Sequence, residues 1–89
     1  MPDERESVLL RLRKADAELS LLGDRLRQFR RNHFALVDGV PCLVASNINQ
    51  RAELETELGE LYRTLFRKRQ QRAGILAEYS ELRARKVTR

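Results

Sequence analysis

The sequence lacks tryptophan and contains one cysteine, two prolines and four glycines among its 89 residues. A single cysteine cannot form an intramolecular disulfide, so the disulfide framework of small secreted domains is excluded. The longest unbroken apolar runs, 34–37 and 40–45, are far too short to span a membrane. The N-terminal residues also lack the basic and then apolar pattern of a signal peptide. We therefore expect a soluble, cytoplasmic protein with no membrane partner.

Aromatic residues make up only 6% of the chain, whereas charged residues make up 35% and give a net charge of +5. A charge-rich, aromatic-poor and periodic sequence is typical of long helices rather than of a compact globule. The length allows one small domain, which we expect to comprise residues 1–89.

Mainly apolar residues recur at alternating steps of four and three from Val8 to His33 and again from Leu54 to Leu82, where Lys68 and Arg72 occupy two of the positions. Only a helix places this spacing on one stripe, and the average step of 3.5 residues predicts a coiled-coil seam. The first helix is expected over about residues 4–32, where Asn32 could end it in the left-handed conformation of a C-terminal cap. The second is expected over about residues 48–86, and it starts among the good N-cap residues Ser46, Asn47 and Asn49.

Residues 34–45 lie between these helices and break the heptad pattern. Asp38 and Gly39 are flanked by valines and favour a two-residue hairpin turn, because such a turn needs positive φ at both central residues. Pro41 cannot donate to a strand ladder, so its strand would be an edge strand or would bulge. We favour a small β-hairpin at the tip, with an irregular apolar loop as the alternative. The apolar residues assigned to the tip are Phe34, Leu36, Val37, Val40, Leu43 and Val44.

A fold about the Asp38–Gly39 turn brings the two apolar seams into register. Leu22 then faces Leu58, and the seam turns polar where Val8 would face Arg72. In this register Asp16 and Glu18 lie near Arg63, so acidic residues of the first helix lie close to basic residues of the second. Charges that flank a seam select orientation in coiled coils. The sequence therefore predicts a mainly all-α protein: an antiparallel helical hairpin, or coiled coil, of two long helices.

Both predicted helices carry further apolar residues away from the seam. A helix that is apolar on two sides is normally buried on two sides. We therefore expect a homo-oligomer, with a dimer favoured, in which hairpins pack into a four-helix or larger bundle. The residues assigned to this oligomer or partner interface are Leu10, Leu21, Tyr62, Phe66, Ala73 and Leu76.

No pattern in the sequence indicates catalysis, a cofactor or a metal. The chain has no glycine-rich phosphate loop, no nucleophile elbow, no HExxH and no CxxC. His33 and Cys42 alone do not make a zinc site, which usually needs three or four protein ligands. We interpret both as structural residues and expect no enzymatic activity.

The basic residues support an alternative function. Residues 63–72 and 83–89 are rich in arginine and lysine, and the second stretch is expected to lie beyond the reach of the first helix. It could contact phosphate or an acidic protein through Arg83, Arg85, Lys86 and Arg89. The sequence thus predicts a non-enzymatic interaction or assembly protein that binds a protein partner, in a chaperone-like, scaffold or accessory role. A small helical-hairpin nucleic-acid-binding protein is the alternative.

Overall fold

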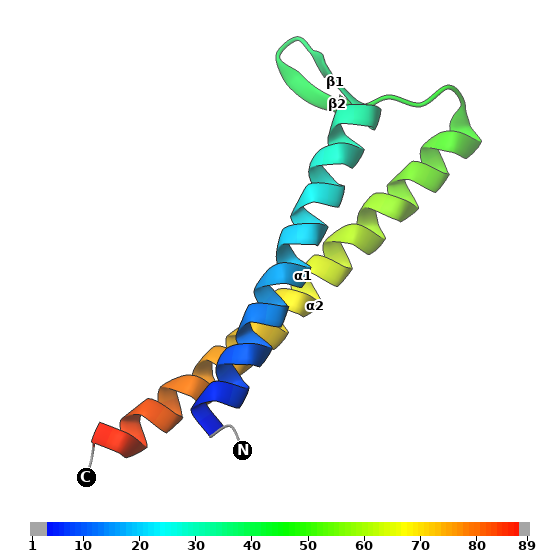
Figure 1. Cartoon of the computed structure of the whole chain (residues 1–89). Coiled ribbons are helices and arrows are strands. Elements are labelled where there is room, and N and C mark those ends of the chain that lie inside the picture. Colours follow the sequence, from blue (N-terminus) through cyan, green and yellow to red (C-terminus); the bar gives the residue numbers. More distant parts are fainter. Residues whose placement is uncertain (1–3, 88–89) are drawn as a thin grey trace.

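The computed structural model describes residues 4–87 of the chain. Its elements are α1 (Glu4–His33), β1 (Phe34–Val37), β2 (Val40–Leu43) and α2 (Ile48–Val87). The two helices run antiparallel alongside each other, with the strands at one end and both chain ends at the other (Figure 1). The molecule is elongated and measures 63 Å along its longest axis. The predicted mainly all-α helical hairpin is thus confirmed.

The predicted seam forms the contact between the helices. On α1 every seventh residue is buried, namely Val8, Ala15, Leu22 and Phe29. The seam residues between them, such as Leu19, are half-buried. On α2 Leu54 is buried and the other seam residues are half-buried. Two helices can cover each other along one stripe only, so this narrow ribbon is the whole core of the described chain.

The start of α2 is fixed by polar side chains, as the sequence predicts. The backbone N–H of Gln50 donates to Oδ1 of Asn47 over 2.8 Å, which is the N-cap hydrogen bond. Oε1 of Gln50 in turn accepts a hydrogen bond from the hydroxyl of Ser46 over 2.6 Å. The end of α1 differs from the expectation. Asn32 has no positive φ, and the helix runs through it to His33 and leads directly into β1.

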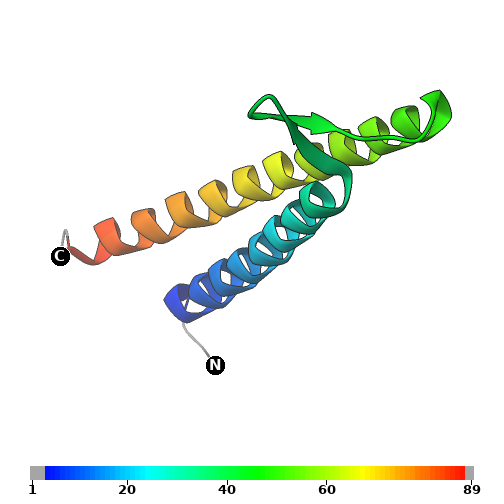
Figure 2. The same cartoon turned by 90° about the horizontal axis from the view of Figure 1, so that it is seen from above.

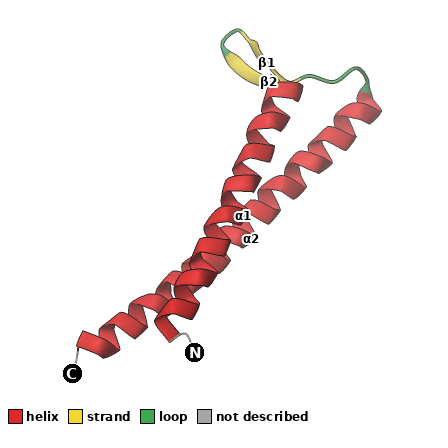
Figure 3. Cartoon of the chain, viewed as in Figure 1, coloured by secondary structure: helices red, strands yellow, loops and turns green. Residues whose placement is uncertain are grey.

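The tip is a two-stranded antiparallel β-hairpin (Figure 3), so the favoured alternative is confirmed over the irregular loop. Asp38 and Gly39 have φ values of 50° and 80°, which are the two positive values that the tight turn requires. Pro41 pairs with Leu36 in an unbroken register, so β2 is an edge strand without a bulge.

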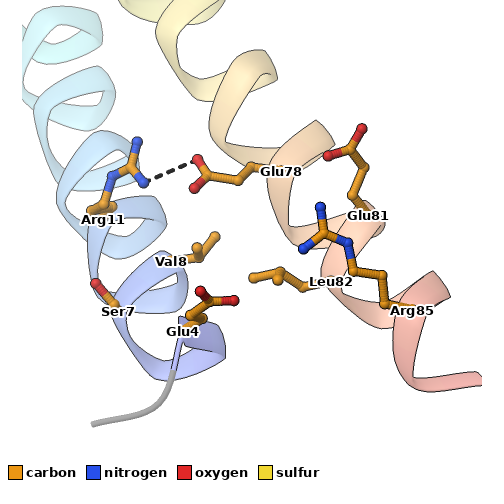
Figure 4. Close-up of a pocket in the computed structure, with 8 residues that line it drawn as sticks. All are labelled: Glu4, Ser7, Val8, Arg11, Glu78, Glu81, Leu82 and Arg85. Carbon is orange, nitrogen blue, oxygen red and sulfur yellow. Dashed lines mark hydrogen bonds and ion pairs between the residues drawn. The ribbon is translucent and has the colours of Figure 1, made fainter. Parts of the chain in front are cut away.

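The register between the helices differs from the expected one by about two to three helical turns. Asp16 pairs with Arg72, and Val8 faces Leu82 rather than Arg72 (Figure 4). The expectation assumed that the chain returns directly from the turn into the second helix. Instead, residues 44–47 carry the chain sideways from the hairpin, and the first turns of α2 extend past the end of α1 (Figure 2). Each residue of α1 therefore meets a later part of α2.

Candidate interaction surfaces

Two cross-helix contacts show which residues share each flank of the hairpin. Arg30 donates to the hydroxyl of Tyr62 over 2.6 Å, and each of these residues directly follows a seam residue. Arg11 pairs with Glu78 over 3.0 Å, and each of these directly precedes one. Successive helical residues are rotated by about 100°. Residues that follow a seam residue therefore lie on one flank, and residues that precede one lie on the other.

The first flank carries four exposed apolar residues of α2, and we call it the apolar flank. Tyr62, Phe66, Ala73 and Leu76 each directly follow a seam residue and are all exposed. Phe66 is the most exposed of the three large side chains, at 63%. These four predicted interface residues therefore share one surface of the described chain. The hydrogen bond from Arg30 to Tyr62 lies on the same surface.

The two predicted interface residues of α1 are exposed but lie elsewhere. Leu21 directly precedes Leu22 and so belongs to the second flank, where it is 60% exposed. Leu10 lies two positions before Leu12, which turns it to the outer face of α1. The six residues expected to form one interface are therefore divided among three faces of the hairpin.

The second flank, which we call the polar flank, holds shallow grooves lined mainly by charged and polar side chains. One groove lies near the chain ends (Figure 4), and its only large apolar contributors are Val8 and Leu82. Its other lining residues are Glu4, Ser7, Arg11, Glu78, Glu81 and Arg85. A polar, open groove of this kind lacks the apolar walls of a small-molecule site.

The same groove corrects the expectation for the basic tail. Arg85 lies beside Glu4 and Glu81, so α1 reaches this part of α2 after all. The cause is the shifted register, which brings the acidic start of α1 next to Arg85. Arg83 is exposed. The side chain of Lys86 and the whole of Arg89 lie outside the described part of the structure.

Charged residues within the seam of α2 find partners on α1. Nζ of Lys68 lies 2.8 Å from Oε2 of Glu18, and Nε of Arg72 lies 2.5 Å from Oδ1 of Asp16. The hydrogen bond from Lys68, followed by its positive charge, lowers the pKa of Glu18. Both basic side chains are half-buried and reach out from the seam to the flanks. The basic stretch 63–72 is therefore partly neutralised across the hairpin, although by other pairs than expected.

The tip exposes most of the apolar residues assigned to it. Leu36, Val37, Val40 and Val44 are exposed, whereas Phe34 and Leu43 at the base of the hairpin are half-buried. The ring of Phe34 meets that of Phe29 edge-on, with centroids 6.3 Å apart, and this contact anchors the hairpin on α1.

Sequence reasoning missed Ile48, which is highly exposed at the first position of α2. The sequence does contain a sign of this exposure, because Ile48 is the one large apolar residue in the capping segment and falls outside the heptad pattern.

His33 and Cys42 show no arrangement suited to chemistry. The imidazole of His33 lies against the ring of Phe29, with centroids 4.8 Å apart. Cys42 is a free, half-buried residue of β2. In the described chain no three histidine, cysteine, aspartate or glutamate side chains are grouped as metal ligands would be. Neither described helix is both long and apolar enough to cross a membrane.

These features define a class of protein: an antiparallel helical hairpin with a β-hairpin tip, whose unpartnered surfaces are an apolar flank and the tip. Comparisons with family models, with curated proteins and with solved structures find no match.

Proposed function

We propose that this chain is a non-enzymatic interaction and assembly protein that homo-oligomerises by packing its apolar flank against a second copy. The observation that carries the proposal is the position of Tyr62, Phe66 and Leu76, which are exposed on one flank of one helix. Several large apolar side chains exposed on one face are typical of an interaction surface. The proposal includes a cytoplasmic location, which rests on the sequence alone.

The apolar flank suits a helical partner. Ala73 and Gly59 lie among the large side chains on this flank, and small residues allow another helix to approach closely. Burial of one Phe or Leu side chain contributes roughly 1.5–3 kcal/mol. A scaffold, accessory or chaperone-like role would use the assembled hairpins to hold a further protein.

The proposal is tested by sedimentation of the wild type and of Phe66→Asp at micromolar concentration. The wild type should be a dimer or larger, and Phe66→Asp should weaken self-association by at least about tenfold, as loss of a central aromatic contact does. Helix content by circular dichroism should stay unchanged. A monomeric wild type would contradict the proposal.

Leu21→Asp is the matched control, because Leu21 is about as exposed as Phe66 but lies on the polar flank. It should leave the mass unchanged. If Leu21→Asp dissociates the assembly while Phe66→Asp does not, the subunit contact lies on the polar flank and our assignment is wrong.

A second candidate function is binding to nucleic acid. Arg63, Arg67 and Arg69 are exposed on α2 and form none of the cross-helix ion pairs described above. Such binding would weaken steeply with salt, through release of counterions from the phosphates. A pull-down at moderate salt, with and without nuclease, distinguishes the two functions: a partner that survives nuclease favours the assembly protein.

A further inference from the structure

The hydrogen-bonding pattern of the β-hairpin shows which backbone groups point outward. The N–H of Val44 donates to the carbonyl of His33 over 2.7 Å, so this pair is of the hydrogen-bonded kind. Hydrogen-bonded and non-hydrogen-bonded pairs alternate along an antiparallel ladder. In the register of this hairpin, Leu36 and Pro41 therefore form a non-hydrogen-bonded pair. The backbone groups of both residues face away from the hairpin, one set on each edge.

The two edges consequently differ. On β1, Leu36 presents an N–H and a carbonyl, both available to another strand. On β2, the matching position is Pro41, which has no N–H and interrupts any ladder. Ala35, Leu36 and Val37 are all exposed, so no other described element covers the β1 edge. The hairpin has one open edge and one blocked edge.

We propose that the open edge of β1 pairs antiparallel with β1 of a second copy, about a two-fold axis near Leu36. The result is a four-stranded sheet in the order β2, β1, β1, β2, with the two copies joined tip to tip. Pro41 then lies on both outer edges of the sheet. The sheet therefore closes at four strands and does not grow by addition of further strands.

Charge complementarity favours a second copy of this chain as the partner of the open β1 edge. Antiparallel pairing about Leu36 brings the turn of one copy alongside the start of β1 in the other. Asp38 in the turn then approaches Arg31 in the last turn of α1 of the second copy. Within the described residues neither side chain takes part in an ion pair of its own chain. The two-fold arrangement forms this complementary contact twice.

The pairing also covers the most exposed apolar side chain of the strands. Leu36 is 73% exposed, and in the tip dimer it lies beside its counterpart from the second copy on the same face of the sheet. An isolated two-stranded hairpin is marginally stable in water, whereas four strands support one another. The contact is small, so the dimer should be weak and concentration-dependent.

The test is a thiol cross-linking experiment on the full chain. Leu36→Cys is made in a Cys42→Ser background that also carries Phe66→Asp, which removes the flank contact. A short bis-maleimide cross-linker should join two copies through Leu36→Cys. Val40→Cys is the control, because Val40 is also exposed, at 58%, but lies on β2. In the proposed sheet the two copies of Val40 are three strand spacings, about 14 Å, apart across the strands, and they are also offset along the strands.

The expected result is cross-linking of Leu36→Cys at least tenfold faster than of Val40→Cys, with a loss of this preference in Arg31→Glu. Equal rates at the two positions, or no cross-linking at Leu36→Cys at the highest soluble concentration, would overturn the proposal. A second test uses the blocked edge. Pro41→Val restores a backbone N–H on β2, so this edge should also pair with further copies and the tip dimer should give larger assemblies.

The tip contact and the flank contact can be told apart. Phe66→Asp should abolish the flank contact and leave tip cross-linking through Leu36→Cys intact. Leu36→Lys should abolish the tip contact and leave the flank contact, which sedimentation measures. If Phe66→Asp leaves the mass unchanged while Leu36→Lys reduces it, the tip dimer stands and the proposed flank assembly fails.

Discussion

Lys68 and Glu18 form an ion pair across the hairpin, with 2.8 Å between Nζ and Oε2, although Lys68 occupies a seam position of α2. An apolar residue there would add to the core but would fit several registers equally well. A charge that reaches one particular carboxylate favours a single register. Arg72 and Asp16 form the same kind of pair one turn further along.

Exchange of the two charges tests this function of the pair. Glu18→Lys and Lys68→Glu should each lower the melting temperature, because each places like charges together. The double variant should recover most of the loss. Thermal unfolding of the four proteins, at matched concentration, gives the coupling directly. Independent, additive effects would show that the side chains do not interact.

Acid should weaken the same pair. Lys68 lowers the pKa of Glu18 below its ordinary value of 4.5, first by hydrogen bonding and then by charge. A carboxyl group whose pKa is lowered on folding stabilises the fold above its unfolded pKa, and this contribution is lost as pH falls through the folded pKa. The melting temperature of Glu18→Gln should therefore lie below that of the wild type at neutral pH, and the gap should close well below pH 4.5. Glu53→Gln, at an exposed position outside the cross-helix pairs, should show no such change. A gap that widens in acid would refute the assignment.

Much of the fold could be predicted from local patterns. The heptad steps located both helices, the helix ends were predicted to within a residue or two with the help of the capping residues, and Asp38–Gly39 specified the hairpin turn. These features depend on neighbours in the sequence, where spacing and backbone preference suffice.

The register between the helices could not be predicted in the same way. If one helix is shifted along the other by seven residues, the two heptad seams match again, so several registers bury similar apolar side chains. The direction taken by residues 44–47 selects one of them, and no local signal encodes that direction. The same error misplaced the basic tail, because Arg85 was expected to extend beyond α1 and instead lies beside Glu4.

Two glycines should respond to alanine in opposite directions. Gly39 has φ of 80°, and no atom lies within 4 Å of the position that a β-carbon would take, so Gly39→Ala is penalised by backbone strain alone, by about 1 kcal/mol. Gly74 lies within α2, again with open space around it. Gly74→Ala should stabilise the helix by up to about 1 kcal/mol. Urea unfolding of both variants checks the pair, and destabilisation by Gly74→Ala would indicate that another chain packs closely there.

A designed disulfide tests the register at the chain ends. Val8 and Leu82 point toward each other between the helices (Figure 4), so Val8→Cys with Leu82→Cys should form an intramolecular disulfide in a Cys42→Ser background. The bond closes a long loop and should stabilise the fold by about 2–4 kcal/mol, seen as a higher melting temperature that is lost on reduction. Val8→Cys with Arg72→Cys, the pair that the direct return of the chain would place together, should stay reduced under the same conditions. Efficient oxidation of that second pair within one chain would mean that α2 is shifted along α1 from the register of this structure.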